Sequence, residues 1–152
     1  MRKSLLGFTL VVVSGIFLLG FSPAYAQQSA IDVKGFTRKT VEEQVLAGYL
    51  KELNGKYKMT VSTFTFEPGG YVGPHHHAGP GFRCVLSGEV TNIEGEKRGV
   101  YRAGECYWES GDVSHTPRND GDKPAVGLII ELLPASLTGN SLLPVPQHSQ
   151  HK

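Results

Sequence analysis

Residues 69–88 read GGYVGPHHHAGPGFRCVLSG and hold three consecutive histidines directly after Pro74. Proline fixes its own φ and biases the residue before it toward extended structure, so this stretch favours a strand. Side chains alternate between the two faces of a strand. His75 and His77 are therefore expected on one face and His76 on the other. Two imidazoles on one face make half of a metal site.

The second half is expected downstream. Residues 82–86 (FRCVL) are β-prone and end at the turn signal Ser87-Gly88. A similar unit, residues 104–115, ends at His115. Runs of histidine also occur in solvated loops without a specific role, and that is the alternative interpretation. The surrounding strand and turn signals favour the metal interpretation.

The spacing around the histidines resembles the first motif of the cupin superfamily, G-x5-H-x-H-x3-E-x6-G. Gly69, His75, His77 and Gly88 stand at the required positions, but the glutamate position holds Gly81. The resemblance extends over residues 37–134.

The downstream unit resembles the second cupin motif, G-x5-P-x-G-x2-H-x3-N. Gly104, His115 and Asn119 match, whereas Ser110 and Asp112 replace the proline and the inner glycine. The two motifs together indicate a fold more than a reaction, because one fold hosts many chemistries.

The resemblance implies an all-β protein built as a single double-stranded β-helix, the jelly-roll barrel of cupins. It places His75, His77 and His115 in the interior, where they would bind a divalent transition metal. Fe, Mn, Ni, Cu and Zn all suit imidazole ligands. Gly81 cannot supply the carboxylate that the family uses as fourth ligand. Three other residues are poor candidates for that role: His76, Glu105 and Glu109.

Two further residues are candidate substrate contacts. Arg83 lies two positions after Gly81, so on a regular strand it faces the same way and could pair with a substrate carboxylate. A surface arginine is the equally reasonable alternative. Of Tyr107 and Trp108, alternation sends one inward, and Tyr107 is the second candidate contact.

Three functional hypotheses follow. Three-histidine iron sites occur in some cupin enzymes, including thiol dioxygenases, gentisate-type dioxygenases and a diketone-cleaving enzyme, so the first is a metal-dependent dioxygenase. The second is a non-catalytic cupin that binds a metal or a small ligand. The third is a metal-free sugar-binding or isomerase-like cupin whose histidines act as acid and base.

Short β-prone segments divided by Gly and Pro turns independently indicate a β-sandwich or barrel. Phe64 and Phe66 are expected in its core. Residues 36–53 are ambiguous between helix and strand, and we favour a strand for the first part. We expect a signal peptide over residues 1–26, a loose leader over 27–36, the cupin domain over 37–134 and an irregular tail over 135–152.

The N-terminus has the features of a secretory signal. Arg2-Lys3 precede an apolar run, and Ala24-Tyr25-Ala26 reads as a cleavage site. Cleavage after Ala26 predicts a periplasmic or secreted protein with no stable membrane association. An uncleaved membrane anchor is the alternative, because the run is nearly long enough to span a bilayer.

The charge composition argues against nucleic-acid and lipid partners. Of the 15 Lys and Arg residues, two lie in the signal segment, which leaves 13 against 14 Asp and Glu and a formal net charge of −1. No basic patch is visible in the sequence. A small molecule is therefore the expected partner.

Cys84 and Cys106 are the only cysteines. In the cupin fold the strand after the first motif lies beside the strand that begins the second, which makes a disulfide one interpretation in an oxidising compartment. Two small buried thiols are the other, because neighbouring strands do not fix the register. The resemblance also implies a homodimer, since small cupins often pair.

Overall fold

A computed structural model describes residues 30–145 of the chain. The expected signal peptide over residues 1–26, the first three residues of the leader and the last seven residues of the chain lie outside the described part. No helix within residues 30–145 is long and apolar enough to cross a membrane.

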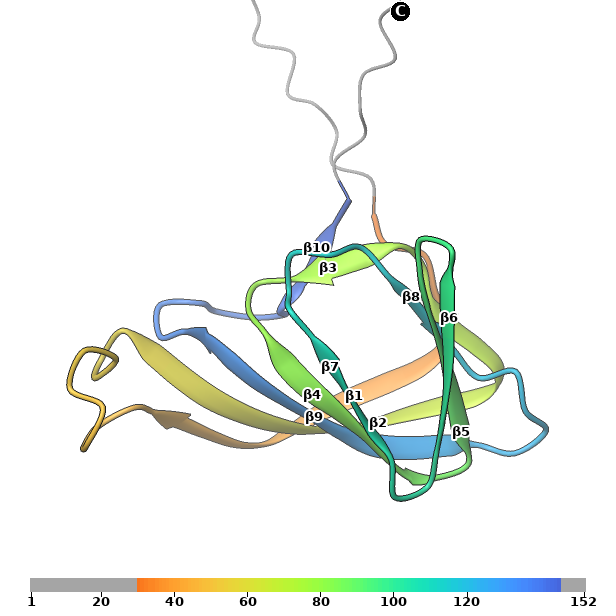
Figure 1. Ribbon diagram of the computed structural model, residues 1–152, viewed down its shortest axis with the longest axis horizontal. Helices are drawn as coiled ribbons and strands as arrows, with labels where there is room; N and C mark the ends of the chain where they lie inside the picture. Colours follow the sequence, from red (N-terminus) through yellow and green to blue (C-terminus); the bar gives the residue numbers. More distant parts are fainter. Residues whose placement is uncertain (1–29, 146–152) are drawn as a thin grey trace, which may run out of the picture.

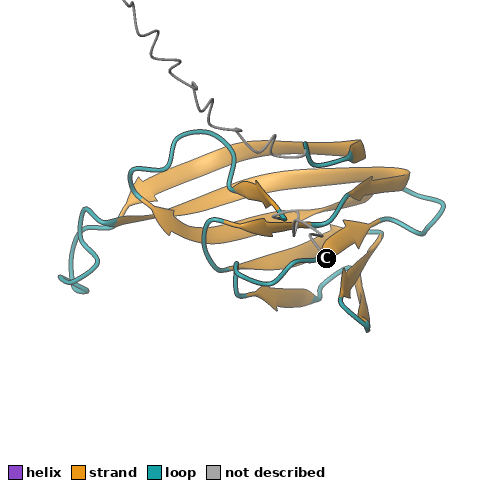
Figure 2. Cartoon of the chain, turned by 90° about the horizontal axis from the view of Figure 1, so that it is seen from above, coloured by secondary structure: helices purple, strands orange, loops and turns teal. Residues whose placement is uncertain are grey.

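The described residues form strands and turns without a helix (Figures 1 and 2), which confirms the all-β prediction. In chain order the ten strands are β1 (Val33–Val45), β2 (Tyr57–Val72), β3 (His75–His77), β4 (Gly81–Ser87), β5 (Glu89–Glu94), β6 (Lys97–Arg102), β7 (Cys106–Glu109), β8 (Thr116–Arg118), β9 (Ala125–Pro134) and β10 (Leu142–Pro144).

The main sheet is antiparallel and curls into a nearly closed barrel. Its strand order is β6-β5-β8-β2-β9-β4-β7, with β1 paired to β2, while β10 and β3 form a separate two-stranded sheet. Figure 1 shows these strands wrapped around one interior, with the turn between β1 and β2 projecting from one end. The predicted cupin barrel is thus present.

Strands begin earlier and end later than the sequence indicated. β1 starts at Val33, inside the expected leader, and pairs with β2 from Val33 to Val45, which decides the ambiguous segment in favour of a strand. β2 continues to Val72, through Pro68, Gly69 and Gly70. These residues form an irregularity opposite Gly35, whose φ is 55°.

The tail also contributes a strand. β10 lies within the segment expected to be irregular and pairs antiparallel with the histidine strand β3, Leu142 opposite His77 and Pro144 opposite His75. This pairing gives β3 a hydrogen-bonded neighbour where it would otherwise have an open edge.

The interior has an apolar part and a polar part. The apolar core consists of Phe64, Phe66, Val72, Val85, Val90, Ala125 and Ile129, as expected for the two phenylalanines. The polar part lies around β3 and holds the three predicted histidines together with buried charged residues. A barrel interior that keeps charges must pair them, because an unpaired buried charge is costly.

A disulfide joins Cys84 on β4 to Cys106 on β7. The two residues are directly opposite in the register of these antiparallel strands. The register, which the sequence alone did not give, selects the disulfide over the pair of buried thiols.

Replacing both cysteines by serine should lower the free energy of unfolding by about 3 kcal/mol, because the bridge closes a loop of 22 residues and restricts the unfolded chain. Urea unfolding of the oxidised chain and of the C84S/C106S variant measures the difference. An unchanged midpoint would show that the bridge contributes nothing to stability.

Candidate metal centre

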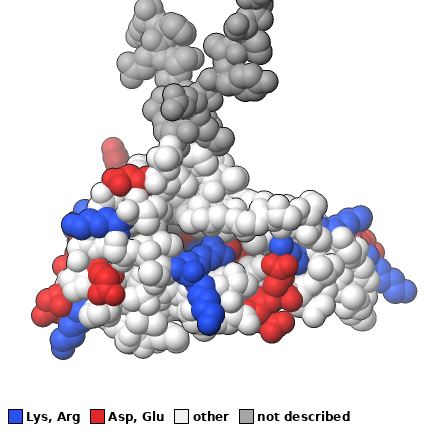
Figure 3. Space-filling view, turned by 180° about the vertical axis from the view of Figure 1, so that it is seen from behind, with Lys and Arg blue, Asp and Glu red and all other residues white. Residues whose placement is uncertain are grey.

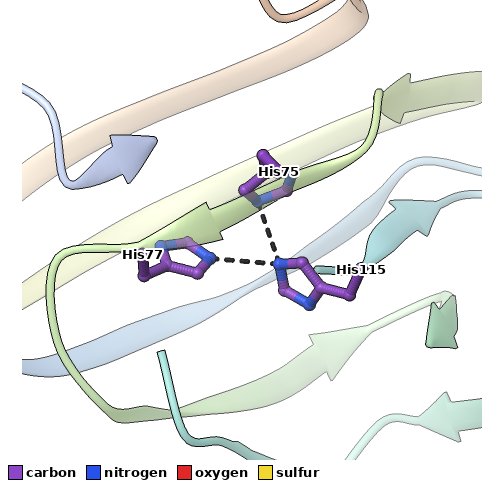
Figure 4. A group of neighbouring side chains, drawn as sticks. All are labelled: His75, His77 and His115. Carbon is purple, nitrogen blue, oxygen red and sulfur yellow. Dashed lines mark hydrogen bonds between the residues drawn. The ribbon is translucent and has the colours of Figure 1, made fainter. Parts of the chain in front are cut away.

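The fold brings His75, His77 and His115 together in the barrel (Figure 4). On β3 the two outer histidines are buried and His76 is half-buried, which confirms the expected alternation. His115 is fixed opposite His75 by two backbone hydrogen bonds, from His75 N to His115 O at 3.1 Å and from His115 N to His75 O at 2.9 Å.

The three imidazoles turn the same ring nitrogen toward one another. His115 Nε2 lies 3.0 Å from His75 Nε2 and 3.2 Å from His77 Nε2, and the three donor atoms are all within 4.8 Å of one another. Two nitrogens about 2.1 Å from one ion and 90° apart would be about 3.0 Å apart. The observed spacing therefore suits a shared divalent ion.

The other ring nitrogens have acceptors beside them. His75 Nδ1 donates to the Gly73 carbonyl at 2.8 Å, which leaves the lone pair on Nε2. His115 Nδ1 lies 2.7 Å from Glu109 Oε1, and His77 Nδ1 lies 3.1 Å from Glu131 Oε1. A hydrogen bond such as that of His75 orients a metal-binding histidine, whereas the contacts of His77 and His115 are close approaches to a carboxylate. Burial, followed by the nearby His115, lowers the pKa of His75 to about 3, so this ring is neutral.

Three buried charged residues and the half-buried Arg38 surround the histidines. Arg83 Nη2 lies 2.7 Å from Glu109 Oε2 and 3.0 Å from Glu131 Oε1, and Arg38 Nη2 lies 2.6 Å from Glu131 Oε2. Two arginines thus balance two glutamates.

Both glutamates are held ionised. Burial alone would raise the pKa of each carboxyl, but their neighbours outweigh it. Contacts with His115, His77 and Arg83 hold the pKa of Glu109 well below its usual value. Contacts with His77, Arg83 and Arg38 lower the pKa of Glu131 to about 2.

Glu109 is the member of this charged network whose carboxylate oxygens lack hydrogen bonds. Its side chain is 5% exposed, yet neither carboxylate oxygen accepts a hydrogen bond of acceptable geometry from the described residues. Its short contacts with Arg83, His77 and His115 do not have the geometry of hydrogen bonds. A buried carboxylate without a hydrogen bond, beside three converging Nε2 atoms, is a donor set that fits a divalent cation.

Position 81 has no room for a side chain. A Cβ atom built on Gly81 would lie 2.2 Å from the Ile130 carbonyl oxygen and 2.6 Å from Arg83 Nη1. The Arg83 side chain therefore occupies the space next to the motif's vacant glutamate position. Restoring a glutamate at residue 81 would require the backbone of β9 to shift.

The two candidate substrate contacts both face inward. Arg83 and Tyr107 line the cavity next to the histidines. Arg83 is paired with both glutamates, and Tyr107 stacks on Tyr101 with ring centroids 4.2 Å apart. Trp108 points outward and is 54% exposed, as alternation required for one of the two aromatic residues.

The cavity next to the histidines is small, about 30 Å³, yet large enough to hold a water molecule, which needs roughly 10–15 Å³ of such space. A second hollow of about 210 Å³ shares Phe36, Arg38 and Leu142 with it. The shared residues belong to β1 and to the start of β10, so the two hollows adjoin there.

Sequence reasoning missed two members of the site, Arg38 and Glu131. Glu131 had a signal, because it is the single charged residue in the apolar run of β9. Arg38 had none, since it lies among other polar residues of β1.

Comparison with known proteins identifies the class of this barrel. A family model described as "Cupin domain" matches residues 62–131. No functionally curated protein matches the chain. Together with the fold, this match shows that the chain belongs to the cupin superfamily.

Solved structures share the fold at low sequence identity. The polyketide cyclase RemF from Streptomyces resistomycificus is 14% identical with a TM-score of 0.55, over 77% of this chain and 75% of that one. A cupin-2 domain protein from Rhodospirillum rubrum is 14% identical with a TM-score of 0.54, over 76% and 68%. Oxalate oxidase in complex with the substrate analogue glycolate is 21% identical with a TM-score of 0.53, over 74% and 56%.

The Gly81→Ala variant should lose about 1–3 kcal/mol of stability, because its Cβ meets the β9 backbone. Gly121→Ala is the matched control, since its Cβ would first meet the Asn119 side chain at 3.2 Å. Thermal unfolding of both variants measures the difference. Equal stability of the two would contradict the packing described around residue 81.

Proposed function

We propose that this cupin is an exported protein that binds one divalent transition metal through His75, His77 and His115 and receives a small molecule beside it. The convergence of three buried Nε2 atoms carries the proposal. Imidazole donors suit Fe, Mn, Ni, Cu and Zn, so the donor set defines the class of metal and not its identity.

The small molecule would reach the metal from the larger hollow. Phe36, Arg38 and Leu142 line both spaces and would be passed on the way. The four charged side chains around the histidines cancel, so a bound divalent ion would leave the interior positively charged. That balance favours an anionic or chelating ligand, with Arg83 and Tyr107 as its expected protein contacts.

Oxygenation of the bound molecule is the catalytic form of this proposal. A three-histidine set leaves coordination positions for other molecules, and aromatic side chains line the cavity. The metal would supply Lewis acidity or electron transfer to O₂. The protein would orient the substrate and exclude bulk water. Non-catalytic binding of a metal or small ligand is the alternative that uses the same residues.

The metal-free alternative, a sugar-binding or isomerase-like cupin, has less support. It needs histidines that exchange protons with a substrate. Here Nδ1 of each of the three histidines lies beside a carbonyl or carboxylate oxygen, and their Nε2 atoms face one another.

Export is supported by the disulfide between Cys84 and Cys106, because such bridges persist in oxidising compartments. On the face shown in Figure 3, Lys and Arg are interspersed with Asp and Glu, which offers no single-sign surface for nucleic acid.

The outer face of β4 and β7 exposes Phe82 and Trp108, whose rings pack edge to face with their centroids 4.9 Å apart. This face would be the contact surface of a homodimer.

The chain produced without an affinity tag should bind one divalent transition metal, and His77→Ala should abolish that binding. His76→Ala is the matched control, since its side chain points to the other face of β3, and it should bind like the unaltered chain. Metal analysis after dialysis measures both. Equal loss in the two variants would contradict the assignment.

If the protein is an oxygenase, the iron-loaded chain should consume O₂ with at least one small thiol, diphenol or diketone. His77→Ala should remove this activity. An oxygen electrode measures the rate. Metal binding without O₂ consumption on any of these compounds would favour the non-catalytic form of the proposal.

A further inference from the structure

Gly81, which has no side chain, lies between two glutamates on the neighbouring strands of the sheet. In the sheet, Gly81 is directly opposite Glu109 of β7 and directly opposite Glu131 of β9. Residues paired across neighbouring strands point to the same face. The carboxylate absent from position 81 is thus replaced by two inward carboxylates on the adjacent strands.

The two glutamates differ in the hydrogen bonds that they accept. Glu131 is satisfied, because Arg38, Arg83 and Ser141 all donate hydrogen bonds to its oxygens, at 2.6–3.0 Å. Glu109 accepts no hydrogen bond of acceptable geometry from the described residues, although it is equally buried. Glu131 therefore has a structural role already, and Glu109 has oxygen lone pairs to offer.

One oxygen of Glu109 lies beside the inward-facing nitrogen of His77, and the other lies beside His115 Nδ1, on the outer side of that ring. Glu109 Oε2 is 3.2 Å from His77 Nε2, the atom that faces the other two histidines, and this equals the distance between His77 Nε2 and His115 Nε2. Donor atoms in adjacent positions around one ion are about 3.0 Å apart. Glu109 is not among the residues whose donors all lie within 4.8 Å of one another. Binding therefore requires the carboxylate to reorient, and its terminal torsion is soft in glutamate.

We propose that Glu109 is the fourth protein ligand of the metal, so that β7 supplies the carboxylate that β4 lacks at Gly81. This inference rests on the proposed metal binding by the three histidines. On binding the ion, the carboxylate gives up part of its contact with Arg83, which keeps Glu131 as its second partner. The ion and its ligands then carry one positive charge instead of two.

The test compares three Glu→Gln variants of the full chain. Glu109→Gln should weaken the binding of Zn²⁺ by more than about 100-fold, beyond the 10–100-fold effect typical of groups that only orient a ligand. Glu131→Gln should stay within that range. Glu105→Gln is the matched control, since Glu105 is exposed and accepts a hydrogen bond from the Arg102 amide at 2.6 Å. The Zn²⁺ affinity of this variant should equal that of the unaltered chain. Competition with a chromophoric chelator measures all three.

A spectroscopic measurement separates a ligand from a residue that only orients one. The unaltered chain, labelled with ¹³C at the glutamate carboxyl carbon and loaded with Cu²⁺, should show a ¹³C coupling in pulsed electron paramagnetic resonance. Glu105→Gln should keep that coupling and Glu109→Gln should lose it.

The outcomes are distinct. Copper bound by nitrogen alone, without the ¹³C coupling, would overturn the assignment of Glu109 and leave the three-histidine proposal standing. A coupling that survives in Glu109→Gln would assign the carboxylate to another glutamate and also overturn it. An unaltered chain that binds neither Zn²⁺ nor Cu²⁺ would overturn both proposals.

Discussion

Two backbone hydrogen bonds between His75 and His115 hold the site together. They join residues 40 positions apart and place a third imidazole opposite the two that β3 already presents on one face. Because β10 pairs with the other edge of β3, the histidine strand is held from both sides, although it is only three residues long. The geometry of the donor atoms thus depends on main-chain pairing, which is less mobile than side-chain packing. A site built this way is organised before any ion arrives.

The second constraint is electrostatic. The barrel buries two glutamates and Arg83 next to the histidines, with the half-buried Arg38 beside them, and such groups are tolerated only when each charge meets an opposite one. Arg83 is central because it contacts both carboxylates, and Arg38 fixes the far side of Glu131. Glycine at position 81 leaves space that the Arg83 side chain fills. The glycine that removes the motif's carboxylate therefore also makes room for the arginine at the centre of this charged network.

Sequence reasoning predicted the fold and the three histidines, because side-chain alternation and motif spacing can be read without knowing how the strands are paired. Alternation gave the opposite faces of His75 and His76, and spacing selected His115. The other features of the site depend on the register of the strands, which the sequence does not show. Glu109 ranked as a poor ligand because nothing in the sequence shows that it lies opposite Gly81. The disulfide needed the same information. Arg38 lies among other polar residues of β1, and β10 lies in a segment whose composition indicated an irregular tail, so their contribution appears only when the barrel closes.

The central claim is that one cation is held inside the barrel by side chains from separate strands. A crystal structure of the metal-loaded chain, with anomalous diffraction recorded at the absorption edge of the metal, tests it most directly. The account predicts one anomalous peak about 2.1 Å from Nε2 of His75, His77 and His115. A peak only at the protein surface, with the three imidazoles hydrogen-bonded to one another and no ion between them, would contradict it.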